Sequence, residues 1–89
     1  MRAVITVVGK DMVGILARIT AVCAKDQVNV VEVTQSILQD LFAMIMLVDI
    51  SKCTVPFSKL SDELTDVGNG MNLKIHVMHE DIFNAMHRV

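Results

Sequence analysis

Two glycines, Gly9 and Gly14, frame a short loop between a run of β-branched residues and an amphipathic helical pattern. Between them the chain reads Lys10-Asp11-Met12-Val13. Backbone N–H groups at the start of a helix are free to bind an anion, and a glycine lets a ligand approach them closely. Asp11 offers a carboxylate for an ammonium group. The pattern therefore fits a cradle for a small ligand, with ordinary turn glycines and an N-cap at Asp11 as the alternative.

Other arrangements that could carry chemistry are few. His76 and His79 lie three residues apart on an expected strand, so their side chains point to opposite faces and cannot share a metal. Glu80 and Asp81 begin an expected helix, where acidic residues are typical partners of the helix dipole. The glycine loop has neither the P-loop nor the GxGxxG spacing. We therefore expect no catalytic residue, no metal site and no cofactor, and hence no enzyme.

Composition narrows the class of protein. The 89 residues suffice for one small domain, yet 53% are hydrophobic, which favours self-association. The net charge is −2, the eight Lys and Arg are scattered, and Trp and Tyr are absent, which argues against nucleic-acid binding. No apolar run could span a bilayer and no signal peptide is recognisable, so we expect a cytoplasmic protein without membrane contact. Cys23 and Cys53 lack CxxC spacing and are expected to be buried free thiols, with a metal or redox pair as the alternative.

Hydrophobic periodicity predicts six elements and a tail. We expect strands over residues 2–8, 28–38, 41–51 and 71–79, and helices over residues 13–26, 54–68 and 80–89. Gln39 and Asp40 form the turn of a hairpin, and Thr54 is the expected N-cap of the second helix. Glycines within residues 68–70 end that helix. In the second strand, Val31 and Val33 are expected on one face and Val30 on the other.

This βαββαβ order predicts an α+β, ferredoxin-like sandwich: a four-stranded antiparallel sheet with two helices on one face, followed by a short C-terminal helix. The first and third strands lie in the centre. Because the third strand is apolar on both faces, something must cover the second face. We expect the tail, residues 80–89, to pack there on the first and third strands, or on a neighbouring subunit. Its apolar side comprises Ile82, Phe83, Met86 and Val89.

The stretch GKDMVGILARITAVCAKDQVNVVEV resembles the first half of an ACT domain, a small ligand-sensing module of amino-acid metabolism. In that family a strand ends in a loop of the type G-x-D-x-x-G-[ILV], a helix follows, and an Asn opens the second strand. The matching positions are Gly9, Asp11, Gly14, Ile15, Leu16 and Asn29. Many relatives carry Arg, Lys or Pro where this chain has Met12. The tail HEDIFNAMHRV resembles that of small stand-alone ACT proteins related to the glycine cleavage system transcriptional repressor.

The resemblance implies a regulatory module that binds a small molecule, in particular an amino acid, at a subunit interface. The implied site lies between the first loop of one subunit and the edge strand of its neighbour. Its residues are Gly9, Asp11, Met12, Val13, Gly14, Ile15, Leu16 and Asn29. We expect an ACT domain over residues 1–79, a helical tail over residues 80–89, a homodimer or higher closed homo-oligomer, and a regulated protein partner. The alternatives are a structural interaction module without a ligand and a small hydrolase of acylphosphatase type.

Overall fold

The computed structural model describes residues 1–10 and 14–86; the predicted site residues Asp11, Met12 and Val13, and Val89 of the tail, lie outside the described residues. The elements follow in the order β1 (Arg2–Gly9), α1 (Ile15–Lys25), β2 (Asn29–Leu38), β3 (Leu41–Asp49), α2 (Phe57–Gly70), β4 (Lys74–His79) and α3 (Glu80–Met86). The predicted βαββαβ order with a terminal helix is confirmed.

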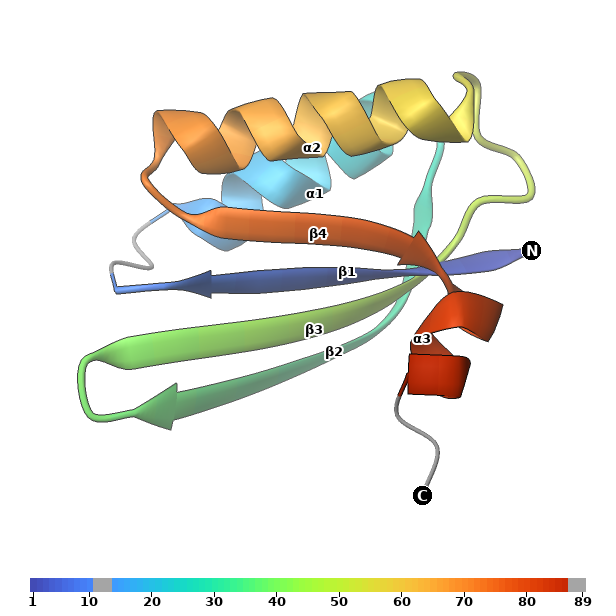
Figure 1. The fold of residues 1–89 in the computed structure, drawn as a ribbon. Coiled ribbons are helices and arrows are strands. Elements are labelled where there is room, and N and C mark those ends of the chain that lie inside the picture. The colour runs from blue at the N-terminus through green and yellow to red at the C-terminus, as the bar shows by residue number, and fades with distance from the viewer. Residues whose placement is uncertain (11–13, 87–89) are drawn as a thin grey trace.

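The four strands form one antiparallel sheet in the order β2-β3-β1-β4. As predicted, β1 and β3 are central and β2 and β4 are edges. Helices α1 and α2 lie side by side over one face of the sheet, which we call the helix face (Figure 1). The opposite face, which we call the open face, carries Arg2, Val4, Thr6 and Val8 of β1. The fold is thus the expected ferredoxin-like sandwich.

The hydrophobic core lies between the helix face and the two helices. The fully buried residues come from both central strands and from the inner sides of α1 and α2; the largest are Ile5, Val7, Met44, Met46, Val48, Ile15, Ile19, Cys23, Leu60 and Leu64. Apolar residues alternate with other residues along the strands and recur every three or four residues along the helices. Their side chains therefore meet in one layer between the sheet and the helices.

A bulge in β2 changes which of its side chains face the core. The register on β3 shifts between Val30 and Glu32, so Val31 is an extra residue in the strand. Val30 consequently lies opposite Val48 and packs against the core, on the same face as Val33. The prediction that Val30 faces away from Val33 is wrong, because a strict period of two does not anticipate an inserted residue.

Helix α2 ends at Gly70, within the predicted stop at residues 68–70, but Gly68 lies inside the helix. A Cβ at Gly68 would lie 2.9 Å from Cγ1 of Ile75 and 3.0 Å from the carbonyl oxygen of Leu73. Glycine at this position therefore allows α2 to pack closely on β4, rather than ending the helix.

The start of α2 also differs from the expectation. Pro56 occupies the N-cap position that the sequence assigned to Thr54. The N–H of Thr54 instead donates a hydrogen bond to the carbonyl oxygen of Asp26, at 2.9 Å, and so ties the segment before α2 to the end of α1.

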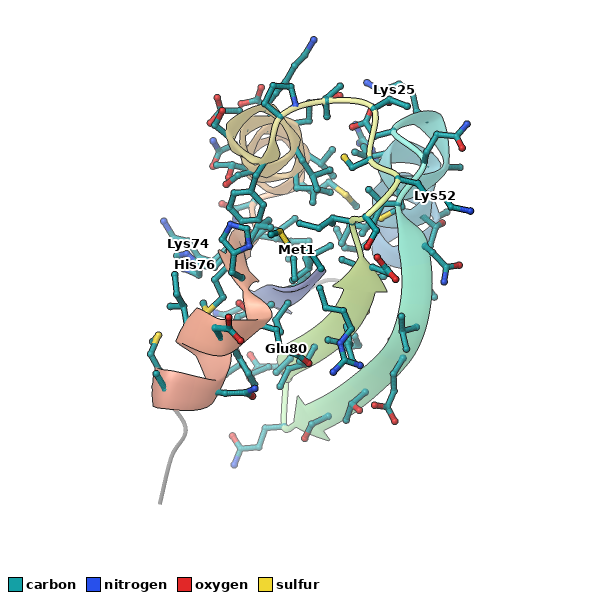
Figure 2. The ribbon with its side chains drawn as sticks, turned by 90° about the vertical axis from the view of Figure 1, so that its right-hand side faces the viewer. Met1, Lys25, Lys52, Lys74, His76 and Glu80 are labelled. Atoms are coloured by element: carbon teal, nitrogen blue, oxygen red, sulfur yellow. The ribbon has the colours of Figure 1, made fainter. Side chains whose placement is uncertain are left out.

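Helix α3 lies on the open face, across the sheet from α1 and α2 (Figure 2). It packs against β1 and β4, and Glu80 at its start forms an ion pair of 2.8 Å with Arg2. The predicted docking on the open face is confirmed for β1, while β4 supplies the second strand. Of the residues expected on the docking side, Ile82 and Met86 are largely exposed and Phe83 is half-buried.

The open face is covered at one end of the sheet and exposed at the other. Val4 is 2% exposed, whereas Val8, on the same face of the same strand, is 39% exposed. Leu41 and Ile45 of β3 are similarly exposed beside Val8. Helix α3 therefore supplies part of the predicted cover over the open face. The described residues leave the rest of the open face uncovered.

Candidate functional site

The predicted site residues fall at opposite ends of the sheet. Gly9, which ends β1, lies opposite Phe42 of β3, whereas Asn29, which begins β2, lies opposite Asp49 of β3. Phe42 and Asp49 are separated by seven residues of one strand, which corresponds to about 24 Å. A single chain therefore does not bring the glycine loop and Asn29 together.

At the loop end, the two glycines are required for different reasons. A Cβ at Gly9 would overlap the side chain of the buried Leu73, so a larger residue at this position would require Leu73 to shift. Gly14 has a φ of 77°, a left-handed conformation that L side chains adopt only with strain. Apart from its chain neighbours, no residue in the described part of the chain has an atom within 4 Å of the position of its Cβ, so these residues leave the space beside Gly14 open.

Helix α1 starts directly beside this open space. Gly14 occupies the N-cap position, and its carbonyl oxygen accepts the N–H of Arg18 at 3.1 Å. The first N–H groups of a helix have no intrahelical acceptor, so they are available at this end of the sheet. Of the two predicted site residues that follow, Ile15 is buried in the core and Leu16 is exposed.

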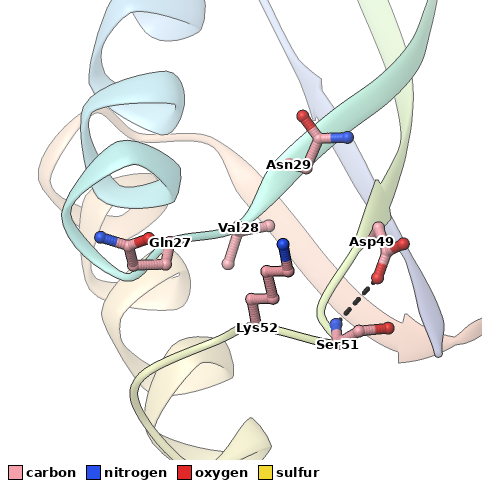
Figure 3. Close-up of a pocket in the computed structure, with 6 residues that line it drawn as sticks. All are labelled: Gln27, Val28, Asn29, Asp49, Ser51 and Lys52. Carbon is pink, nitrogen blue, oxygen red and sulfur yellow. Dashed lines mark hydrogen bonds between the residues drawn. The ribbon is translucent and has the colours of Figure 1, made fainter.

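At the other end of the sheet, an open pocket of about 450 Å³ surrounds Asn29. Its lining comes from the junction between α1 and β2 and from the end of β3: Gln27, Val28, Asn29, Asp49, Ser51 and Lys52. Lys52 extends from the loop after β3 toward the space between Val28 and Asp49 (Figure 3). The pocket therefore presents a cation, a carboxylate, two carboxamides and a hydroxyl group.

Hydrogen bonds hold the acidic side of this pocket in place. Oδ1 of Asp49 accepts the N–H of Ser51 at 2.8 Å, and the α-amino group of Met1 donates to Oγ of Ser51 at 2.7 Å. Hydrogen bonds from the Ser51 hydroxyl and N–H, with smaller contributions from the α-amino group and Arg2, lower the pKa of Asp49. Asp49 is therefore a carboxylate at neutral pH, and it can accept a cationic group.

The cationic side of the pocket is free to bind an anion. Among the ion pairs of the residues that the structure describes, none involves Lys52. A ligand with a carboxylate and an ammonium group would meet an opposite charge for each of them in this pocket.

The two histidines of β4 lie on opposite faces of the sheet, as expected. His76 lies opposite Thr6 on the open face, and His79 lies opposite Ala3 on the helix face. The ring of His79 stacks on that of Phe57, with centroids 4.2 Å apart. Within residues 1–10 and 14–86, no group of three His, Cys, Asp or Glu side chains could hold a metal ion. No helix in this range is long and apolar enough to cross a membrane.

Both cysteines are free thiols, as predicted. Cys23 is buried beneath α1, and burial, together with the nearby Asp26 charge, raises its pKa to about 11. Cys53 is only half-buried, and its Sγ lies 3.3 Å from the carbonyl oxygen of Val55. Because the Cys23 thiol stays protonated at neutral pH, it acts as a small apolar core group rather than a nucleophile.

Comparison with known proteins decides the family. A family model described as an ACT domain matches residues 2–78. The chain belongs to the ACT domain family. The matched range ends just before α3, and members of this family are small-ligand-binding regulatory domains.

Relatives of similar length extend the comparison. A UPF0237 protein of Methanococcus maripaludis is 51% identical over 86 residues, which cover 97% of this chain and 96% of that protein. A UPF0237 protein of Listeria innocua is 46% identical over the whole of both chains. The solved structure of an ACT domain protein from Streptococcus pneumoniae is 36% identical, covers 98% of both chains and superposes with a TM-score of 0.80. This chain is thus similar to small proteins that consist of one ACT domain.

Five lining residues of the pocket were missed by the sequence interpretation: Gln27, Val28, Asp49, Ser51 and Lys52. A signal for them existed. A hairpin that turns at Gln39 and Asp40 must bring the start of its first strand beside the end of its second, and so Asn29 beside the residues after Val48. A charged pair at that position, Asp49 and Lys52, could have been assigned to the site with Asn29.

Proposed function

We propose that this ACT domain binds a free amino acid between two copies of the chain and that binding changes its association with a protein partner. The observation that carries the proposal is the separation of the two half-sites. The open backbone at Gly14 and the charged pocket at Asn29 lie at opposite ends of one sheet, and Phe42 and Asp49, which mark these ends on β3, are about 24 Å apart. A second copy of the chain, packed antiparallel to the first, would bring the Gly14 half-site of one copy beside the Asn29 pocket of the other.

Strand β2 offers the surface for such a second copy. It is an edge strand, and Val31 and Ile37 on it are 49% and 73% exposed. Glu32 is the only charged residue between Val28 and Leu38, so little opposes pairing with another strand. Antiparallel pairing of two β2 strands would place Asn29 of one copy at the Leu38 end of the other. That end is the one at which Gly9 ends β1.

The ligand chemistry follows from the charges of the two half-sites. Asp49 would accept the ammonium group, and Lys52 with the carboxamide of Asn29 would hold the carboxylate from one copy. The free N–H groups at the start of α1 in the other copy would bind the same carboxylate. Gly14 would leave room for the ligand backbone, and Asp11 would supply a second acceptor for the ammonium group.

A thermal-shift screen of the free amino acids tests ligand binding. A ligand at 100 times its dissociation constant stabilises the folded chain by about 2.7 kcal/mol, which is easily seen in a small domain. For the best ligand, Lys52→Gln should weaken binding measured by calorimetry. Lys74→Gln, which removes the same charge from β4, is the matched control and should bind as the unaltered chain does.

Sedimentation equilibrium tests the second copy. We expect a dimer or higher closed assembly at micromolar concentration, tightened by the ligand. A single 9.8 kDa species with and without ligand would contradict the interface proposal. Equal affinities of the Lys52→Gln and Lys74→Gln variants would contradict the assignment of the pocket.

A structural interaction module without a ligand is the second candidate. It is favoured by the exposed apolar side chains of Val8, Leu41 and Ile45 on the open face. This candidate predicts that no amino acid raises the melting temperature, while Ile45→Ser still weakens self-association or partner binding.

A further inference from the structure

A buried carboxyl group lies where α1 ends against α2, outside the pocket. Asp26 is the C-cap of α1 and is 2% exposed. Its Oδ2 atom is buried, and no N–H or O–H group of the described residues donates a hydrogen bond to it; the same holds for Oε1 of Glu63 on α2. Two buried carboxylate oxygens that each lack a donor are costly to maintain, and one proton placed between them satisfies both.

The surrounding groups fix which carboxyl group carries the proton. From α1, Nζ of Lys25 pairs with Oε2 of Glu63, and the Cys23 thiol lies near Asp26; from α2, Lys59 is the other cation near the pair. Burial first, and then the hydrogen bond with Glu63 and its charge, raise the pKa of Asp26. The hydrogen bond from Lys25 first, and then the one from Asp26, lower the pKa of Glu63. The proton therefore belongs to Asp26, and Glu63 is the ionised acceptor.

The end of a helix reinforces this assignment. A negative charge at the C-terminus of a helix is repelled by the dipole of that helix, and Asp26 caps α1 at this end. A neutral Asp26 avoids this repulsion. Ionised Glu63 is tolerated because Lys25, in the last turn of α1, lies against it.

We propose that Asp26 and Glu63 share a single proton across the contact between α1 and α2, and that loss of this proton loosens the contact beside the pocket. Backbone hydrogen bonds provide the connection to the pocket. The carbonyl oxygen of Asp26 accepts the N–H of Thr54 at 2.9 Å, two residues after Lys52. Gln27, which follows Asp26 directly, already lines the pocket. Ionised Asp26 would repel Glu63 and displace both of these segments.

The stability of the fold should then depend on pH in a defined direction. A carboxyl group with a raised pKa in the folded state binds more protons there than in the unfolded chain. Its stabilising contribution is therefore complete at acidic pH and is lost as the pH rises from the ordinary value of 3.8 through the raised value. The lowered pKa of Glu63 has the opposite effect at more acidic pH. Stability should be greatest in the interval between the two, where the pair holds one proton.

Carboxyl ¹³C NMR titration tests the shared proton directly. In the unaltered chain, Asp26 should titrate above 3.8. In Glu63→Gln it should titrate closer to that value, because only burial then opposes ionisation. A titration of Asp26 at or below 3.8 would overturn the proposal. An unchanged titration in Glu63→Gln would also overturn it, because it would show burial alone.

Asp26→Asn provides a second test that does not need the Glu63 variant to fold. The amide donates permanently to Glu63, so the melting temperature should lose the decline that the unaltered chain shows as the pH rises above the ordinary value of 3.8. At the alkaline end, the variant should melt above the unaltered chain. Asp66→Asn, an exposed change on α2, should keep the decline.

The backbone amide shifts of Gln27 and Thr54 should follow the Asp26 titration and become insensitive to pH in Asp26→Asn. If they do not follow it, the connection to the pocket is refuted.

Discussion

The two ends of the sheet are built differently from the same strands. At the pocket end, charged side chains are held in place: Ser51 orients Asp49, Glu80 pairs with Arg2, and α3 covers the open face. At the loop end, the structure relies on backbone, with Gly14 in a left-handed conformation beside open space. One end therefore offers fixed charges and the other offers free N–H groups. The proposed site would combine the charges of the pocket end with the backbone groups of the loop end.

The difference also explains the apolar surface. Burying an aliphatic side chain stabilises a fold by about 1.5–3 kcal/mol, and Val4 is buried because α3 lies over the pocket end. Val8 at the loop end has no such cover from the described residues and remains 39% exposed. The loop end, which holds the Gly14 half of the proposed site, is thus also the end at which apolar side chains of the open face stay exposed. Exposed apolar surface of this kind is typical of an interaction site.

The largest effect is expected at the loop end. Gly14→Val places a β-branched residue at a φ of 77°, which costs about 1–3 kcal/mol in backbone strain and fills the open space beside α1. We expect amino-acid binding measured by calorimetry to fall below detection while the circular dichroism of the sheet is retained.

Gly70→Ala is the matched control for Gly14. A Cβ at Gly70 also meets nothing within 4 Å, but Gly70 does not have a positive φ. The control should therefore fold and bind as the unaltered chain does. Binding by Gly14→Val with unchanged affinity would leave Gly14 as an ordinary turn glycine.

A smaller effect is expected from removing the cover at the pocket end. Phe83 of α3 is half-buried, and Phe83→Ala should destabilise the fold by up to about 1.5–3 kcal/mol, measured by thermal or urea unfolding. Met86→Ala, on the exposed side of the same helix, should have little effect. If truncation after His79 leaves both the melting temperature and the mass in solution unchanged, α3 does not contribute to the fold or to its assembly.

The sequence predicted the fold because its signals are local. Alternation in β1 and β3, spacings of three and four in α1 and α2, and the turn at Gln39 and Asp40 all lie within single elements. Val30 was assigned to the wrong face because a bulge changes the register without changing the composition of the strand. Gly68 was taken as a helix end because its actual role depends on β4, an element that packs on it only in three dimensions.

The candidate site was predictable only in part for the same reason. Gly9 and Gly14 could be identified from a loop motif, but Asp49 and Lys52 join Asn29 only through the pairing of β2 with β3. The buried Asp26 carries no sequence signal, because an acidic residue at the end of a helical pattern is ordinarily exposed.

The smallest predicted effect concerns Asp49 and its dependence on pH. Because hydrogen bonds from Ser51 lower the pKa of Asp49 in the folded state, its contribution to stability is present above its ordinary value of 3.8 and is lost as the pH falls through the lowered value. Asp49→Asn should therefore melt slightly below the unaltered chain at neutral pH, and the difference should shrink on acidification. Asp62→Asn, an exposed change on α2, should show no such convergence. The same Asp49→Asn variant should lose affinity for the amino acid at neutral pH, because its carboxamide cannot neutralise an ammonium group. A variant that melts lower at neutral pH but binds with full affinity would restrict Asp49 to a structural role at the pocket end, and would move the ammonium-binding group to the loop end.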